Sequence, residues 1–120
     1  MQKLIFIVDD TDSILTLAAA MLEDDYRVLT MASAAKMLSL IEKKRPDLIL
    51  LDIEMPEMTG FEAIAVLKGD PDKQRIPVVF LTGYIDDDVL SRASEAGALG
   101  VISKSDIKTE LLSRVKGYIE

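Results

Sequence analysis

The chain contains no cysteine and no histidine among its 120 residues. The absence of cysteine excludes disulfides, thiolate nucleophiles and cysteine metal sites. The absence of histidine excludes imidazole as a base and as a metal ligand. A metal bound by this chain is therefore held by oxygen atoms, which favours Mg²⁺, Mn²⁺ or Ca²⁺.

Long apolar runs are also missing, since none approaches the ~20 residues that a membrane-spanning helix needs. The first apolar stretch, Leu4–Val8, is too short for a signal peptide and is followed by two acids. We therefore expect a cytoplasmic protein with no membrane partner. The net charge of −7 argues against direct nucleic-acid binding by this chain. It does not exclude a DNA-binding domain outside it.

The composition fits one globular domain over residues 1–120, with 49% hydrophobic and 29% charged residues. Whether that domain is a whole protein or a piece of a longer one is left open. Short apolar stretches alternate with stretches of helical periodicity, which predicts a parallel sheet covered on both faces by helices. We expect strands at 3–8, Arg27–Met31, Leu48–Asp52, 78–81 and Gly100–Ser103, and helices at 13–23, 33–44, 61–68, 86–96 and 106–118.

Candidate helix caps stand at several of these boundaries. We expect caps from Thr11 or Asp12 for the first helix, from Ser33 for the second, and from Ser105 or Asp106 for the last. The fourth helix is expected to end at Gly97 and to bury Val89, Leu90, Ala93 and Ala96.

Polar residues suited to phosphate and metal chemistry follow four of the five predicted strands. They are three acids, one hydroxyl and one ammonium: Asp9, Asp10, Asp52, Thr82 and Lys104. Taken singly, each also fits an ordinary role as a turn former, helix cap, strand end or solvated side chain. Parallel strands present their carboxyl ends at one edge of the sheet, so together these residues predict one crevice.

Three neighbouring carboxylates repel one another, which raises their pKa values and favours a bound divalent cation. One of the three is then available as a nucleophile toward phosphorus. The metal and Lys104 neutralise the phosphoryl oxygens, and Thr82 donates a hydrogen bond to them. Because histidine is absent, the predicted covalent product is an acyl phosphate on aspartate.

Four motifs carry a family resemblance: IVDD at 7–10, LLDIEMPEMTG at 50–60, VVFLTG at 78–83 and ISKS at 102–105. With them the chain resembles the receiver domains of two-component response regulators, over essentially its whole length. The resemblance implies a flavodoxin-like, CheY-like α/β fold: a doubly wound parallel sheet of five strands in the order 2-1-3-4-5, with five helices. It also implies a phosphoprotein that works as a phosphoacceptor switch.

The same resemblance assigns roles to individual residues. Asp52 matches the phosphoacceptor, and Thr82 and Lys104 match the groups that contact the phosphoryl oxygens. The cofactor is expected to be Mg²⁺, with Mn²⁺ as a substitute. Its implied ligands are Asp52, Asp10 directly, Asp9 through water, and the backbone carbonyl of Glu54.

Partners are implied as well. The expected phosphoryl donor is a phosphohistidine on a sensor histidine kinase or a histidine phosphotransfer protein. The domain is expected to catalyse only its own phosphorylation and dephosphorylation, as a signalling domain and not an enzyme acting on other substrates. The fourth helix, last strand and last helix are expected to bind an effector domain, a target protein or, after phosphorylation, a second copy.

Two positions depart from the family pattern. Val101 stands where most receivers have Tyr or Phe, and its short, stiff side chain cannot swing as an aromatic ring does. We therefore expect residues 82–88 and the helix after them to carry the switch. Ser105 stands where the family usually has proline, and we expect a trans bond between Lys104 and Ser105.

Other interpretations remain open. The side chains of Glu54 and Tyr84 are expected to flank the phosphoryl group, and Glu54 either contacts Lys104 in the absence of metal or is solvated. The chain also fits a receiver-like interaction module that is never phosphorylated. A phosphatase of the haloacid dehalogenase class fits less well, because Glu54 breaks its Asp-x-Asp pattern and the chain is too short for a cap domain. A flavodoxin-like nucleotide binder also fits less well, because no glycine-rich or Ser/Thr-rich phosphate loop follows the first predicted strand of this chain.

Overall fold

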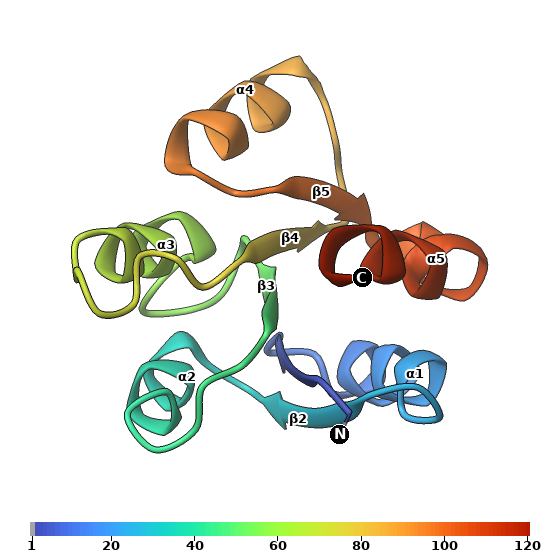
Figure 1. The fold of residues 1–120 in the computed structure, drawn as a ribbon. Coiled ribbons are helices and arrows are strands. Elements are labelled where there is room, and N and C mark those ends of the chain that lie inside the picture. Colours follow the sequence, from blue (N-terminus) through green and yellow to red (C-terminus); the bar gives the residue numbers. More distant parts are fainter. Residues whose placement is uncertain (1) are drawn as a thin grey trace.

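A computed structural model describes residues 2–120, in which strands and helices alternate from end to end (Figure 1). The strands are β1 Leu4–Val8, β2 Arg27–Met31, β3 Leu48–Asp52, β4 Val78–Thr82 and β5 Gly100–Ser103. The helices are α1 Asp12–Leu22, α2 Ala34–Leu40, α3 Gly60–Lys68, α4 Asp87–Ala96 and α5 Ile107–Ile119, and a short 3₁₀ turn, η1 Lys104–Asp106, precedes α5.

All strand pairs in the sheet are parallel, in the order β2-β1-β3-β4-β5, which confirms the predicted topology. Helices α1 and α5 cover one face, whereas α2, α3 and α4 cover the other (Figure 1). The chain leaves β1 toward one side of the sheet and β3 toward the other. The carboxyl ends of these two strands therefore border the crevice in which doubly wound folds bind ligands.

The three central strands are buried along their whole length. Alternate side chains enter two separate cores, so that Ile5 and Ile7 face α1 and α5 while Phe6 and Val8 face α2 and α3. This burial on both faces explains the continuous apolar runs that indicated parallel strands. It also gives the residues at the strand ends a rigid base.

Ser33 and Gly97 stand at helix ends as predicted. Ser33 accepts a hydrogen bond from the backbone of Lys36 at the start of α2. Gly97 ends α4 with a φ of 94°, in the left-handed region that glycine favours. Asp86, which was predicted as the first residue of that helix and not as its cap, accepts a hydrogen bond from the backbone of Val89.

The caps expected for α1 and α5 are wrong. Thr11 and Asp106 occupy the cap positions, but neither side chain makes a capping hydrogen bond. Ser105 does not cap α5 either, because its hydroxyl lies against Ser103. Helix α2 ends at Leu40, before the predicted position near residue 44, and residues 41–43 continue as hydrogen-bonded turns.

Leu90 was predicted to be buried on α4, but 47% of it is exposed. Only Ala93 of α4 is buried, while Val89 and Ala96 are partly buried. Helix α4 covers the β5 edge of the sheet, where the sheet offers it a narrow contact (Figure 1). The buried stripe of the helix is therefore narrower than its apolar spacing indicates.

Two further expectations concern the backbone. No peptide bond in the described part of the chain is cis, so the bond between Lys104 and Ser105 is trans as predicted. Across residues 2–120, no helix combines the length and the apolar character that crossing a membrane requires.

Candidate functional site

The sheet register brings the predicted site residues to one edge. Val8 lies beside Leu51, Asp52 beside Leu81, and Thr82 beside Ser103, so the residues that end or follow β1, β3, β4 and β5 meet there. The residues that line the resulting crevice are Asp10, Thr11, Asp52, Glu54, Thr82, Gly83, Tyr84 and Lys104.

Three carboxylates form the acidic part of the crevice. Oxygen atoms of Asp9, Asp10 and Asp52 all lie within 4.8 Å of one another. Asp9 is completely buried and Asp52 is 2% exposed, whereas Asp10 is exposed to solvent. The backbone N–H of Thr11 donates a 2.8 Å hydrogen bond to Asp9 Oδ1, which holds that carboxylate in place.

Lys104 reaches across the crevice to the two buried acids. Its Nζ lies 2.9 Å from Asp9 Oδ2 and 3.1 Å from Asp52 Oδ1. The side chain of Glu54 is exposed, and within residues 2–120 it forms no ion pair with Lys104. Glu54 was expected either to contact Lys104 or to be solvated, and the structure shows it solvated. The ammonium of Lys104 is instead paired with Asp9 and Asp52.

Burial raises the pKa of Asp52 from 3.8 to about 6. The hydrogen bond from Lys104 opposes this shift, and the negative charge of Asp9 adds to it. The predicted rise in pKa is thus confirmed for Asp52, although burial contributes more than repulsion between carboxylates. Burial lowers the pKa of Lys104, but its hydrogen bonds to Asp9 and Asp52 and their charges give a net upward shift.

The site fits a hard divalent cation. Asp52 Oδ2 is buried and has no hydrogen-bond partner within the described residues. An unpartnered buried carboxylate oxygen is unfavourable unless a cation or a covalent partner reaches it. The available donors are all oxygen atoms, as Mg²⁺ and Mn²⁺ prefer. The carbonyl of Glu54, in the loop after β3, remains the further ligand that we predict.

Thr82 is 8% exposed at the end of β4. Its hydroxyl donates to the carbonyl of Tyr84 at 3.2 Å and accepts from the N–H of Tyr84 at 3.3 Å. Val101 is 6% exposed and packs in the core that contains Phe80 and Ala93. Thr82 is therefore hydrogen-bonded to the loop that leads to α4, while Val101 is an ordinary core residue.

Gly60 is a site residue that sequence reasoning missed. A Cβ on Gly60 would lie 2.4 Å from the carbonyl oxygen of Asp52. The N–H of Gly60 also donates a 2.7 Å hydrogen bond to the carbonyl of Ile53. This glycine therefore lets α3 start directly against the residue that carries the central carboxylate. In the sequence it had only the signature of a loop glycine.

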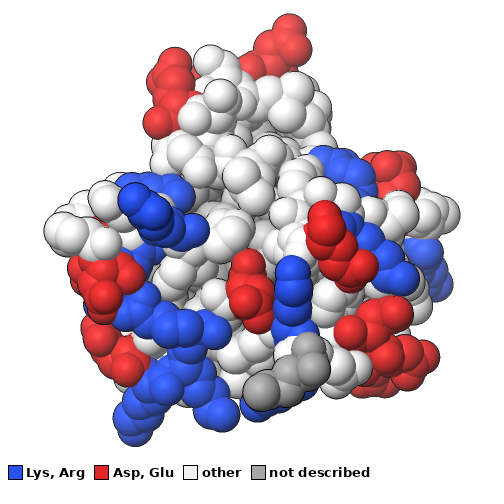
Figure 2. Space-filling view, viewed as in Figure 1, with Lys and Arg blue, Asp and Glu red and all other residues white. Residues whose placement is uncertain are grey.

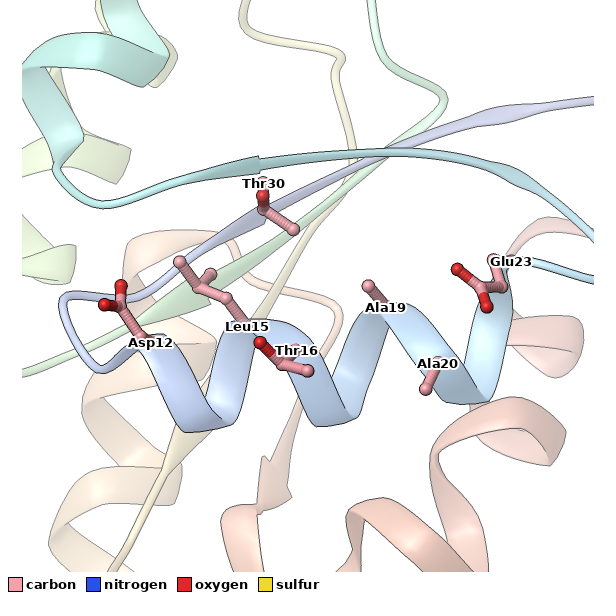
Figure 3. Close-up of a pocket in the computed structure, with 7 residues that line it drawn as sticks. All are labelled: Asp12, Leu15, Thr16, Ala19, Ala20, Glu23 and Thr30. Carbon is pink, nitrogen blue, oxygen red and sulfur yellow. The ribbon is translucent and has the colours of Figure 1, made fainter.

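A second hollow lies along α1 (Figure 3), away from the predicted residues. Its two carboxylates, Asp12 and Glu23, stand at opposite ends of the helix, and alanines and threonines lie between them (Figure 3). Among residues 2–120, no lysine or arginine lines this hollow, and its two carboxylates lie too far apart along α1 to form one site. The crevice at the strand ends is therefore the candidate site. The residues that line the hollow along α1 are Asp12, Leu15, Thr16, Ala19, Ala20, Glu23 and Thr30.

Comparison with known proteins gives a consistent result. A family model described as "Response regulator receiver domain" matches residues 5–116. The polar-differentiation response regulator DivK of Brucella anthropi is 30% identical, over 99% of this chain and 98% of its own. A "Probable cyclic di-GMP phosphodiesterase" of Vibrio cholerae is 34% identical over 99% of this chain, which spans only 27% of that longer relative.

Solved structures give the same picture. The Mn²⁺-bound form of response regulator Rcp1 superposes with a TM-score of 0.86 at 25% identity, covering 98% of this chain and 95% of that one. The phosphorylated cyanobacterial phytochrome response regulator RcpA gives a TM-score of 0.85 at 30% identity, covering 98% and 91%.

Proposed function

This chain belongs to the family of response regulator receiver domains, and from that premise we propose that Asp52 accepts a phosphoryl group in a Mg²⁺-dependent reaction. The observation that carries the proposal is the Asp52 carboxylate itself. It is buried at the end of β3, its Oδ2 has no hydrogen-bond partner in residues 2–120, and two acids and Lys104 surround it. Receiver domains are signalling domains, so the expected outcome of the reaction is a signal.

The reaction we propose is a displacement at phosphorus. A carboxylate oxygen of Asp52 forms a new P–O bond while the P–N bond of a phosphohistidine breaks, and the bonding electrons return to the imidazole of the donor. A bound Mg²⁺ supplies positive charge to the phosphoryl oxygens. We assign the direct metal contact to Asp10, the water-mediated one to Asp9, and a further contact to the carbonyl of Glu54.

Lys104 and Thr82 complete this proposed site. The ammonium of Lys104, now 3.1 Å from Asp52 Oδ1, is placed to neutralise an oxygen of a phosphoryl group on Asp52. Thr82 gives its hydroxyl to the same group once it leaves Tyr84, whose carbonyl it now contacts at 3.2 Å. That exchange of partners links phosphorylation to the loop that leads to α4.

The partners follow from this chemistry. We propose a sensor histidine kinase or a histidine phosphotransfer protein as donor, and an effector domain, a target protein or a second copy as recipient of the signal. The proposed output surface comprises α4, β5 and α5. Leu90 on α4 is 47% exposed, and Leu99, directly before β5, is 52% exposed. Residues 1–120 act in this proposal as one receiver domain.

Mass spectrometry tests the proposal. The chain is incubated with Mg²⁺ and either acetyl phosphate or a phosphorylated histidine phosphotransfer protein. We expect a gain of one phosphoryl group that is lost on removing Mg²⁺ and lost in Asp52→Asn. Asp24→Asn, which changes an exposed acid outside the site, should accept the group as the unchanged chain does.

The competing functions predict other results. A receiver-like interaction module takes no phosphoryl group from either donor, and that outcome would refute the proposal. A phosphatase of the haloacid dehalogenase class turns over a phosphate ester such as p-nitrophenyl phosphate, with Asp52 required for repeated turnover. Stoichiometric labelling without ester turnover separates the proposed switch from both.

A further inference from the structure

Two serines close a turn around Lys104. The Oγ atoms of Ser103 and Ser105 lie 2.8 Å apart, and the N–H of Ser105 donates to Ser103 Oγ at 3.3 Å. Ser103 is the last residue of β5, and Lys104 begins the turn η1. The side chain of Ser103 thus bridges over the lysine backbone at the point where the chain leaves the sheet.

A fixed backbone matters more for Lys104 than for a residue with a shorter side chain. Its ammonium sits on a flexible four-carbon stem, and it must stay near two carboxylates at once. Those contacts measure 2.9 Å to Asp9 Oδ2 and 3.1 Å to Asp52 Oδ1. A backbone fixed by Ser103 and Ser105 leaves fewer orientations in which the ammonium misses its partners.

We propose that Ser103 and Ser105 are positioning residues that aim the Lys104 ammonium at the carboxylates and, after transfer, at the phosphoryl group. The part that concerns the phosphoryl group rests on the proposed function, whereas the part that concerns the carboxylates does not. Neither serine touches the reacting atoms in this proposal. Both act through the backbone of Lys104.

This positioning of Lys104 should have opposite effects on Mg²⁺ affinity and on the rate of phosphoryl transfer. The ammonium occupies oxygen atoms of Asp9 and Asp52, two members of the acidic cluster that fits a cation, so a well-placed Lys104 opposes Mg²⁺ binding. The same ammonium favours phosphoryl transfer by neutralising negative charge. Loosening the turn should therefore tighten Mg²⁺ binding and slow the transfer. A general loss of structure would weaken both.

The test uses the full chain with Ser103→Ala. Calorimetric titration should show Mg²⁺ bound about threefold to tenfold more tightly, as expected for one weakened hydrogen bond. At saturating Mg²⁺, the rate constant for phosphorylation by acetyl phosphate should fall by about the same factor. Ser103→Thr keeps the acceptor oxygen and should restore both values to within twofold of the unchanged chain.

A matched control is available on α5. The hydroxyl of Ser113 donates to the carbonyl of Glu110 at 3.1 Å, far along the helix from Lys104. Ser113→Ala removes a serine hydroxyl of the same kind, and it should change neither Mg²⁺ affinity nor the phosphorylation rate. Thermal unfolding without Mg²⁺ verifies that each variant is folded.

A mutant cycle with Lys104→Met shows whether the serine acts through the lysine. In the Lys104→Met background, Ser103→Ala should leave Mg²⁺ affinity unchanged, because no ammonium remains to compete. The proposal is wrong if Ser103→Ala alters Mg²⁺ affinity equally in both backgrounds. It is equally wrong if metal affinity and transfer rate fall together, or if neither changes by more than twofold.

One readout needs neither metal nor phosphoryl donor. An amine-reactive reagent followed by mass spectrometry measures how fast Lys104 is labelled, and Ser103→Ala should raise that rate severalfold while other lysines react as before. If the unchanged chain accepts no phosphoryl group, the proposed function fails, yet labelling and Mg²⁺ affinity still decide the role of Ser103. Unchanged labelling of Lys104 would overturn the positioning role.

Discussion

At the residue scale, Asp52 is a carboxylate at the end of a strand whose other residues are all apolar and buried. It is 2% exposed, and burial raises its pKa to about 6, above the 3.8 of a solvated aspartate. The folded chain therefore binds this proton more tightly than the unfolded chain does. The associated stability is present below about pH 4 and is lost as pH rises through 6.

Replacing this carboxylate should stabilise the metal-free chain. We expect Asp52→Asn to raise the free energy of unfolding at pH 8 by about 1–3 kcal/mol, since each pKa unit corresponds to about 1.4 kcal/mol. The gain should vanish below about pH 3, where Asp52 is protonated in both the folded and the unfolded state. Urea denaturation at the two pH values without Mg²⁺ measures it. Equal stabilisation at both values would show that burial of the charge is not the cause.

Substituting Asp10 should affect metal binding more than the stability of the metal-free fold, because Asp10 is the exposed member of the acidic cluster. Asp10→Asn should weaken Mg²⁺ binding by about tenfold to a hundredfold, through the loss of one ligand charge. The stabilisation of the fold by millimolar Mg²⁺ should fall accordingly. Thermal unfolding with and without Mg²⁺ measures this. Asp12→Asn, two residues away and outside the cluster, should keep the full Mg²⁺ effect.

At the element scale, the start of α3 depends on one missing methyl group. An added Cβ on Gly60 would lie 2.4 Å from the carbonyl oxygen of Asp52, whereas one on Gly117 in α5 would meet nothing within 4 Å. We expect Gly60→Ala to lower the free energy of unfolding by about 1–3 kcal/mol, as overpacking does. Gly117→Ala should instead raise it by about 0.5–1 kcal/mol.

Urea denaturation of both glycine variants checks this pair. Because Gly60 contacts the backbone of Asp52, its variant should also bind Mg²⁺ less tightly, and Gly117→Ala should not. Equal effects of the two substitutions would contradict the close approach between α3 and β3.

Helix α4 is held by few contacts, and an arginine supplies one of them. Arg92 stacks over the ring of Phe61 in α3 at 4.2 Å from its centroid, and Phe61 in turn packs against Phe80 of β4 with centroids 4.9 Å apart. Only Ala93 of α4 itself is buried. The stacked arginine and the two rings therefore connect α4 to α3 and to the strand that ends at Thr82.

Removing this contact should loosen α4. We expect Arg92→Met to lower the free energy of unfolding by about 0.5–1 kcal/mol and to speed amide hydrogen exchange within α4 more than elsewhere. Arg75→Met is a suitable control, because Arg75 is exposed and no ion pair or ring contact is found for it in residues 2–120. Uniform exchange changes along the chain would contradict a local role.

At the scale of the whole molecule, the charged surface is mixed, and basic and acidic residues gather over different elements. Figure 2 shows lysines and arginines gathered over α2 and the turn after it, whereas α4, which has Asp87 and Asp88 in its first turn, shows acids beside uncharged atoms. The exposed Leu90 belongs to that helix. An exposed leucine beside charged residues suits an interface with an apolar centre and a polar rim, which is consistent with the proposed output surface.

The path of the signal from Asp52 to that surface can be measured. We predict that Mg²⁺ with beryllium fluoride, a phosphoryl mimic, shifts the backbone NMR signals of residues 82–88 and α4 more than those of β5. The physical reason is that Thr82 bonds to Tyr84, whereas Val101 is short and packed in the core. A segment 82–88 that stays unchanged would refute this route.

The fold was predictable because its signals are local. Strands β1, β3 and β4 are buried on both faces and so read as unbroken apolar runs, and Ser33 and Gly97 mark helix ends by their own chemistry. Leu90 was misassigned because its exposure depends on how far the sheet extends beneath α4. The clash that excludes a side chain at Gly60 depends on β3, eight residues away.

The sequence by itself determined the order of the elements and the set of chemical groups that follow the strands, because both depend on residues close together in the chain. Only the tertiary structure decided how those groups meet. It placed Lys104 on Asp9 and Asp52, left Glu54 in solvent, and buried Asp52 deeply enough to raise its pKa to about 6. Pairing and burial are set by neighbours from four different strands, and no local pattern encodes their distances.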